Sequence, residues 1–458
     1  MAVDDGAEAR SSRLAAFLAE IGDVPIITDM QVVRRRSRDF FWYSPILNAE
    51  LHGKSADVIV TPRNEADVIA IARAAALHGV PLTPRGGGTG NYGQAVPLKG
   101  GALVDFSAMN RILWSKPGIL RVEAGAKMGA IDEELRPSGW ELRIHPSTKR
   151  TATIGGFVAG GSGGVGSITY GGLRDPGNIN AARIVTVERE PRVIELRAAA
   201  AQRVNRAFGT TGLITELEAP LAPAWPWIDV ILAFDDFMTA VETGRAIALA
   251  DGIVKKLLTP IAWPIPTAFT DIKDHCPAGK SLLVAMIAEP SLEIFRSLIG
   301  TGVVTYEAPS NESAGKVPLY EYCWNHTTLH MLKGDRSITY LQCLFPHDRL
   351  IATVAKMVAT FGDEVIHHLE FSRYAGHVTA SALPIVRYKS AERLNEIIAA
   401  YEANGVFVAN PHVYTLEDGS RYRRADADQF GFKAEVDPHG LLNPGKMKSF
   451  VGRPWTAA

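Results

Sequence analysis

The residues of this chain that are most able to do chemistry are two runs of glycine, "PRGGGTG" at 84–90 and "TATIGGFVAGGSGGVG" at 151–166. Glycine loses more conformational entropy on folding than other residues, roughly 0.5–1 kcal/mol relative to alanine, so such runs need a compensating role. Because glycine has no Cβ atom, the main-chain N–H groups of a glycine run can approach phosphate oxygens closely and hydrogen-bond to them. Loops at 85–93 and 153–166 therefore predict a diphosphate held from two sides. The alternative is two ordinary loops in a glycine-rich fold.

The better-known phosphate loops do not match these glycines. The chain has no GxxxxGK[ST], which excludes a P-loop nucleotidase. "GGGTGNYG" lacks the GxGxxG spacing, and no acidic residue ends a strand about 20 residues later in the required context. The predicted ligand is therefore a phosphate-bearing molecule bound outside those two folds.

A polar cluster in the middle of the chain, "VIHHLEFSRYAGH" at 365–377, is the main candidate for proton transfer. In a strand, alternation places His368, Glu370, Ser372 and Tyr374 on one face. That face either points at the ligand, where a histidine or tyrosine accepts a proton, or simply faces water. Arg373 would suit a substrate carboxylate, although alternation directs it to the other face unless a bulge turns it.

Two further histidine-bearing segments are candidates. In "YCWNHTTLH", His326 and His330 are four residues apart and share one helical face, a spacing that can bind metal. No third ligand is evident, so a hydrogen-bonded pair is preferred. The alternative is a pocket lined by the polar residues Asn325, His326, Thr327 and Thr328 beside Tyr322 and Trp324. His412, in "NPHVY", follows a strand end where the chain crosses back, and we expect it near the ligand.

The elements that would position these residues follow two different patterns along the chain. Strands and helices alternate after residue 56, with predicted strands at 57–62, 80–88, 102–107, 119–126 and 182–188 and predicted helices at 64–79 and 128–139. Residues 220–415 combine longer helices with strands, among them 281–289, 337–345 and 364–374, which is typical of an antiparallel sheet backed by helices. We predict an α+β fold with domains at 1–218 and 219–415, and a segment at 416–458 that rejoins the first.

Composition excludes several functional classes. The formal net charge is −1, with 48 Lys and Arg against 49 Asp and Glu, so no bulk field attracts nucleic acid. Arginines at 34–36 and 38 precede aromatics at 40–43, a pattern that can bind single strands, but a solvated face is preferred. No apolar stretch reaches the roughly 18 residues of a membrane span, and the start lacks a signal-peptide pattern, so we expect a cytoplasmic protein.

At this point the motifs resemble a known family, the vanillyl-alcohol-oxidase-type flavoproteins, which are FAD-linked oxidases with a PCMH-type FAD domain. Beyond the first loop, the resemblance rests on "VEAGAKMGAIDEEL" (122–135), "HPSTKRTATIGGFVAGGSGG" (145–164), "YGGLRD" (170–175), "FGTTGLITELEAPL" (208–221) and "DPHGLLNPGKM" (437–447). "NPGK" and "GTTGLITE" are similar to the branch that holds D-lactate dehydrogenases and glycolate oxidase subunits.

The resemblance implies FAD and the residues that hold it. It assigns the diphosphate to the first loop, namely Pro84, Arg85, Gly86, Gly87, Gly88, Thr89 and Gly90. It assigns the ribityl and phosphate path to Pro146, Ser147, Thr148, Thr153, Ile154, Gly155, Gly156 and Gly160. Ile214 is the implied backbone partner of the adenine, and the tail brings Asn443 and Lys446 close to the flavin.

Two departures from the family pattern matter. Covalently flavinylated relatives carry a histidine where this chain has Thr89, so we expect non-covalent FAD, with a link to a middle-domain histidine left open. The metal-dependent hydroxyacid dehydrogenases carry GHxGDGNxH and a later EHG. Here the corresponding segments read "AGHVTASALP" and "NPHVYTLEDG", so we expect no metal.

The resemblance implies an FAD-dependent oxidoreductase that moves hydride from a hydroxyl-bearing carbon onto flavin N5. The substrate would be a small 2-hydroxyacid or an aromatic or other alcohol, and candidates for proton and substrate contacts are His368, Glu370, Tyr374, Arg373, His326 and His412. A C=C reductase of the same fold and a flavin-carrying subunit of a heteromeric dehydrogenase remain alternatives. The electron acceptor (oxygen, quinone or carrier protein) and a possible homo-oligomer are left open.

Overall fold

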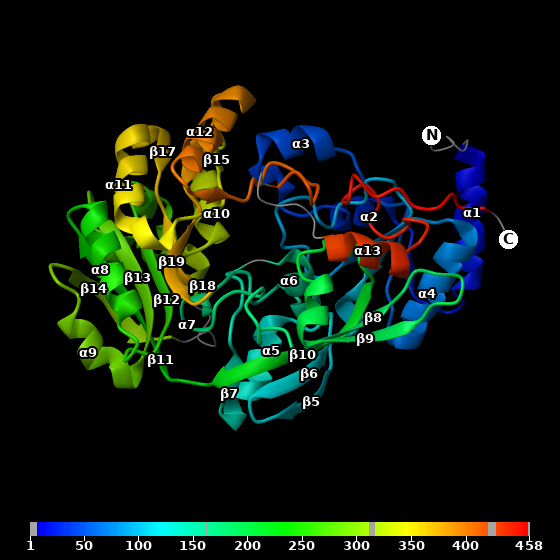
Figure 1. Ribbon diagram of the computed structural model, residues 1–458, viewed down its shortest axis with the longest axis horizontal. Helices are drawn as coiled ribbons and strands as arrows, with labels where there is room; N and C mark the ends of the chain where they lie inside the picture. The colour runs from blue at the N-terminus through cyan, green and yellow to red at the C-terminus, as the bar shows by residue number, and fades with distance from the viewer. Residues whose placement is uncertain (1–6, 162, 311–316, 420–426, 457–458) are drawn as a thin grey trace.

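The computed structural model describes residues 7–161, 163–310, 317–419 and 427–456, so Ser162 of the second glycine loop lies outside the described residues. Two lobes lie side by side (Figure 1). The first lobe is formed by residues 7–223 and 427–456, and the second lobe by residues 227–408. Helices combine with largely antiparallel sheets, which confirms the α+β class.

One sheet of the first lobe has the strand order β1-β2-β4-β3, in which β2, β4 and β3 are parallel. Helix α4 begins after Asn64, whose side chain accepts the Asp67 N–H at 3.0 Å and caps the helix. The first glycine loop follows the end of β3. The elements here are α1 (Ala7–Glu20), β1 (Ile26–Ile27), α2 (Met30–Arg36), α3 (Pro45–Leu51), β2 (Val58–Val60), α4 (Glu65–His78), β3 (Leu82–Arg85) and β4 (Ala102–Asp105).

The other sheet of the first lobe is antiparallel, with the order β5-β6-β10-β8-β9 and β7 paired to the far end of β10. Helix α6, which the second glycine loop enters, contacts β10. The elements are β5 (Ile112–Lys116), β6 (Ile119–Glu123), α5 (Met128–Leu135), β7 (Trp140–Leu142), α6 (Ile154–Gly160), α7 (Ser167–Tyr170), β8 (Ala181–Val185), β9 (Val193–Arg197) and β10 (Leu213–Pro223).

The C-terminal segment packs into the first lobe (Figure 1). Helix α13 (Ala427–Val436) buries Phe432 and Val436 in the core beneath the antiparallel sheet. Leu442 then forms a parallel bridge with Leu82 of β3, beside the start of the first glycine loop. The tail therefore braces the strand that carries this loop.

The second lobe contains three antiparallel sheets, ordered β12-β13-β11-β14, β15-β20-β17 and β18-β19-β16-β21. Strands β11 and β13 are buried throughout, as their continuous apolar runs indicate. The strands are β11 (Trp227–Phe234), β12 (Lys255–Ile261), β13 (Ser281–Ala288), β14 (Val303–Pro309), β15 (Ile338–Tyr340), β16 (Cys343–Leu344), β17 (Val365–Ile366), β18 (Leu369–Tyr374), β19 (His377–Ala382), β20 (Ile385–Arg387) and β21 (Phe407–Val408). The helices are α8 (Phe237–Leu249), α9 (Leu292–Ser297), α10 (Asn325–Gly334), α11 (Leu350–Phe361) and α12 (Ala391–Ala403).

Two expected strands are broken. Residues 337–345 form β15 and β16, and residues 364–374 form β17 and β18, and the members of each pair belong to different sheets. The breaks fall at 341–342 and at 367–368. Residues 338–345 are almost continuously apolar, and such a run has no period-two signal that could mark a break. Among the described residues no helix is long and apolar enough to cross a bilayer.

Candidate functional site

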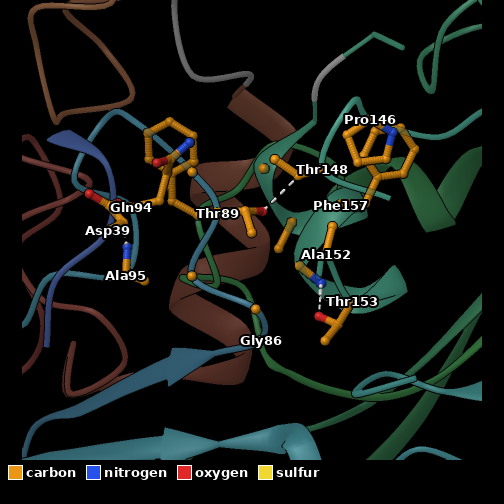
Figure 2. A pocket seen from close by; sticks show the side chains of 18 of the residues that line it. Asp39, Gly86, Thr89, Gln94, Ala95, Pro146, Thr148, Ala152, Thr153 and Phe157 are labelled. Atoms are coloured by element: carbon orange, nitrogen blue, oxygen red, sulfur yellow. Dashed lines mark hydrogen bonds between the residues drawn. The ribbon is translucent and has the colours of Figure 1, made fainter. Parts of the chain in front are cut away.

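A pocket that encloses about 1390 Å³, part of it open to solvent, lies where the two lobes meet. Both glycine loops line it, and Figure 2 shows residues of the two loops around the same space. Of the residues that the family resemblance assigned to FAD, the lining contains Pro84, Arg85, Gly86, Gly87, Gly88, Thr89, Gly90, Pro146, Ser147, Thr148, Thr153, Gly155, Gly156, Gly160 and Ile214. Ile154, Asn443 and Lys446 are buried beside the pocket instead.

The two loops touch through backbone that has no room for side chains. A Cβ on Gly86 would lie 2.0 Å from Thr153 Oγ1, and one on Gly87 would lie 2.3 Å from the Thr151 carbonyl oxygen. Gly88 has φ +64, in the left-handed region that favours glycine. The glycines therefore allow the two loops to contact each other closely, and they also allow the chain to turn. As a result, main chain without Cβ atoms lines this part of the pocket, and we call it the Gly86–Gly87 cradle.

Thr89 of the first loop points toward Thr148, which lies just before the second loop (Figure 2). Its Oγ1 lies 3.4 Å from Thr148 Oγ1. No histidine of the described residues lines the pocket. The loop thus has a hydroxyl where covalently flavinylated relatives have an imidazole.

Buried charged residues lie next to the first loop. The Arg85 guanidinium donates through Nη1 to the Arg38 carbonyl at 2.8 Å, and its buried Nε has no hydrogen-bond partner among the described residues. Asp39 lines the pocket and accepts the Phe41 N–H at 3.0 Å. Burial raises the pKa of Asp39 and lowers that of Lys446, because desolvation penalises each charge.

Asn443 and Lys446 hydrogen-bond to the main chain of segments that form the pocket wall. Asn443 donates to the carbonyl oxygens of Phe208 at 2.6 Å and Gln94 at 2.9 Å. Lys446 Nζ donates to the Gly93 carbonyl at 2.6 Å. These bonds tie the end of the first loop to the segment before β10, so the tail shapes the pocket without lining it.

The second lobe closes the far end of the pocket with Trp324, Asn325, Gln342 and Leu383. Trp324 has φ 52 and ψ −139, a conformation that costs a non-glycine residue about 1–3 kcal/mol and is often found at functional sites. Its N–H donates to Glu370 Oε1 at 2.5 Å. Of the six residues that the sequence offered as a possible pocket wall, only Trp324 and Asn325 line the pocket, whereas Gln342 and Leu383 carried no signal.

His368 and Glu370 share a face, as alternation predicts, and lie behind Trp324. His368 Nε2 is 2.7 Å from Glu370 Oε1 and 3.3 Å from Thr327 Oγ1. Glu370 Oε2 accepts a hydrogen bond from Thr259 Oγ1 at 2.5 Å. Both side chains are fully buried within the second lobe. The face thus packs against α10 and β12, and neither residue lines the pocket or faces water.

The structure does not bring the other candidates to the pocket. Arg373 pairs with Asp251 at 2.5 Å and donates to the Ile168 carbonyl, while Tyr374 is 51% exposed. His326 is half-buried on α10, where desolvation lowers its pKa to about 4. No group of three or more His, Cys, Asp or Glu side chains among the described residues is arranged to hold a metal ion.

The His412 side chain hydrogen-bonds to both lobes, at the point where the chain returns from the second lobe to the first. Its Nε2–H donates to the Tyr340 carbonyl at 2.9 Å, so Nδ1 accepts the Ser44 hydroxyl at 2.8 Å. Both ring nitrogens are therefore engaged, which favours a structural role. Burial lowers the pKa of His412 to about 4.

His412 makes stability depend on pH. The unfolded chain binds a proton near pH 6.5 and the folded protein only near pH 4, so stability is lost as pH falls through this window, by about 3 kcal/mol at most. In His412→Asn, unfolding no longer takes up the proton that His412 binds. Between pH 6.5 and 4.5 we therefore expect the unfolding free energy to change less steeply with pH, by up to about 1.4 kcal/mol per pH unit. Urea unfolding at several pH values measures this, and parallel curves for the two proteins would contradict it.

Comparisons with known proteins agree with this geometry. Residues 56–190 match a family model described as an FAD binding domain. D-2-hydroxyglutarate dehydrogenase of Escherichia coli (strain K12) is 43% identical over 125 residues, 26% of this chain and 12% of that protein. A D-lactate dehydrogenase of Anaerostipes hadrus is 27% identical over 206 residues, 42% of each chain. The chain thus spans less than half the length of these two relatives.

Two solved structures have a similar fold. Alkyldihydroxyacetonephosphate synthase superposes with a TM-score of 0.70 at 16% identity, covering 94% of this chain and 84% of the other. 4-Ethylphenol oxidase from Gulosibacter chungangensis, in complex with isoeugenol, gives 0.67 at 16% identity and covers 97% and 98%. Both similarities concern the fold.

The fold and the two-loop pocket define a flavoprotein with its FAD-binding domain in the first lobe. Residues 56–190 match an FAD-binding domain, so the cofactor is FAD, and the whole chain has a fold similar to that of the two solved structures. The residues present fit this cofactor. The Gly86–Gly87 cradle leaves bare main chain along the pocket, and the unpaired Arg85 Nε is a buried donor in its wall.

Proposed function

We propose that this protein is an FAD-dependent oxidoreductase that removes hydride from a hydroxyl-bearing carbon, with a small 2-hydroxyacid as the favoured substrate class. The observation that supports it is one continuous pocket, which runs from the two glycine loops to Trp324, Asn325 and Gln342 of the second lobe. The relatives named as D-2-hydroxyglutarate and D-lactate dehydrogenases favour the hydroxyacid.

When bound, FAD supplies the hydride acceptor. The glycine loops would hold its diphosphate through main-chain N–H groups, because their Cβ-free surface permits close approach. Trp324 and Leu383 would cover the reacting end and exclude water. The amides of Asn325 and Gln342 would orient a substrate hydroxyl, and a small substrate would fill the space left between them.

We further propose that His368 and Glu370 position Trp324 and do not touch the substrate themselves. The support is the 2.5 Å bond from the Trp324 N–H to Glu370, which holds Trp324 in its costly backbone conformation. His368 in turn orients the Glu370 carboxylate through a 2.7 Å bond. This chain of contacts connects the predicted polar face to the pocket through one aromatic side chain.

His368→Ala and Glu370→Gln are therefore expected to retain FAD and to slow flavin reduction to a similar extent, roughly 10–100-fold, because both release the same wall residue. Stopped-flow reduction without oxygen measures the rate, and tryptophan fluorescence reports whether Trp324 has moved. Glu307→Gln, at a surface ion pair with Arg296, is the control. Unchanged reduction in both variants would remove the positioning role.

An aromatic alcohol is the second candidate substrate. Trp324, Tyr92 and Phe208 all line the pocket, and aromatic rings commonly stack on one another. The fold similarity to 4-ethylphenol oxidase is compatible with this candidate.

An anaerobic screen that follows flavin bleaching tests the proposal. Both enantiomers of lactate and 2-hydroxyglutarate are compared with 4-ethylphenol and benzyl alcohol. Bleaching by a 2-hydroxyacid supports the favoured class, and bleaching by the aromatic compounds alone supports the second candidate. Bleaching by NAD(P)H but by none of the alcohols would overturn both in favour of a reductase. FAD that no donor reduces until a partner protein is added would indicate a flavin-carrying subunit.

A further inference from the structure

A partly buried cation in the pocket wall has no place in the function as described so far. Arg206 lies in the segment before β10, with φ +54, and lines the pocket. Its Nη1 lies 3.4 Å from the Gly161 carbonyl, and its buried Nε has no hydrogen-bond partner among the described residues. No carboxylate of the described residues forms an ion pair with it. Charged groups that are shielded from water are normally paired in proteins, and among the described residues this guanidinium has no counter-charge.

The groups around Arg206 also offer donors. The Tyr92 ring centroid lies 5.9 Å from Arg206 Cζ, and the buried Tyr92 hydroxyl lies close to the same guanidinium. Arg206 packs against Gly161, and Trp324 packs against Gly163, two residues further along the second loop. The Trp324 Nε1–H, which can only donate, is buried and unpaired in the described part of the chain. A ligand at this place must therefore supply acceptors.

We propose that Arg206 binds the carboxylate of the substrate, so that the pocket takes an anionic hydroxyacid and discriminates against neutral alcohols. This inference rests on the proposed function and names the substrate class of the same site. The planar guanidinium matches a carboxylate and forms strong charge-assisted hydrogen bonds with it. The FAD diphosphate is the other source of negative charge in the pocket. Arg206 packs against Gly161, two residues before the Gly163 on which Trp324 of the second lobe packs, whereas the Gly86–Gly87 cradle lies where the first loop meets Thr151 and Thr153.

Oxalate tests the site without turnover, because it has two carboxylates and no C–H bond to oxidise. Its binding to the FAD-loaded protein is followed by the change in flavin absorbance, in the native protein and in Arg206→Gln, Arg206→Lys and Arg174→Gln. Arg174 is exposed and does not line the pocket, so Arg174→Gln removes a nearby positive charge without altering the site. FAD content and the unfolding midpoint are measured for each variant.

We expect Arg206→Gln to keep its FAD and to bind oxalate roughly 10–100-fold more weakly, with Arg206→Lys intermediate and Arg174→Gln unchanged. Loss of FAD from both well-folded Arg206 variants would overturn the proposal and assign the guanidinium to the diphosphate. Unchanged oxalate binding in Arg206→Gln, or no oxalate binding by the native protein, would also overturn it. If Arg206→Gln does not fold, oxalate binding by Arg206→Lys tests the proposal, because lysine keeps the positive charge but cannot donate the two parallel hydrogen bonds of a guanidinium.

The ratio of kcat/KM for lactate to that for 1,2-propanediol, its neutral analogue, separates this inference from the proposed function. A ratio that falls at least tenfold in Arg206→Lys supports the carboxylate contact, and an unchanged ratio overturns it. Oxalate binding that depends on Arg206, together with no reduction by any 2-hydroxyacid, would refute the proposed function and leave the anion site standing.

Discussion

Gly87→Ala is expected to yield a folded protein without FAD. The added Cβ would lie 2.3 Å from the Thr151 carbonyl oxygen, 3.1 Å from the Thr151 carbonyl carbon and 3.2 Å from Ala152 Cα. All three are backbone atoms, so no side-chain rotation relieves the clash. The loops must separate, and the cradle of main-chain N–H groups between them is lost.

The ratio of flavin to protein absorbance after purification, with acid release of the flavin, measures this effect. Gly431→Ala is the matched control, because a Cβ at Gly431 on the helix α13 meets nothing within 4 Å. Helix propensity even favours that change by about 1 kcal/mol. Full FAD content in Gly87→Ala would show that the contact between the loops is not required for binding.

The glycine loops are the part of the site that the sequence predicts best. Their residue types are dictated locally, because few other sequences allow backbone to approach backbone or phosphate so closely. The sequence did not reveal that Gly86 and Gly87 are needed for contact with Thr151 and Thr153. That contact joins segments more than 60 residues apart, and it follows from tertiary packing.

The polar face of β18 illustrates what periodicity leaves out. Alternation correctly placed His368 and Glu370 together, but it offered only two choices, toward the ligand or toward water. The structure has a third arrangement, in which the pair is buried and hydrogen-bonds to the hydroxyls of Thr259 and Thr327. Such a pairing depends on residues from three separate elements, and no local pattern contains it.

Arg206 and Gln342 were missed for related reasons. Gln342 sits at the break between β15 and β16, inside an apolar run where periodicity shows no boundary. Arg206 lies among ordinary polar residues just before the motif at 208–221. Its significance is the absence of an ion-pair partner in the described part of the structure, and that is evident only once the surrounding chain is placed.

The joint between the lobes contains a buried carboxylate on which three donors converge. Glu141 of β7 accepts Lys256 Nζ of β12 at 2.5 Å and Trp227 Nε1 of β11 at 3.0 Å, and it also pairs with Arg136. The Glu141 and Lys256 side chains are 1% and 3% exposed. Because the pocket is lined by both lobes, this joint helps to fix its two ends relative to one another.

Glu141→Leu is therefore expected to lower the free energy of unfolding by about 3–5 kcal/mol, because it leaves the Lys256 ammonium buried. Its one remaining hydrogen-bond acceptor among the described residues is the Leu142 carbonyl at 3.4 Å. The double variant Glu141→Leu, Lys256→Met removes both charges and should recover most of the loss, since a buried pair replaced by apolar groups is often neutral. Urea unfolding monitored by flavin release measures both variants. A loss in Glu141→Leu no larger than that in Glu307→Gln, at the surface pair with Arg296, would show that the joint bears little of the stability.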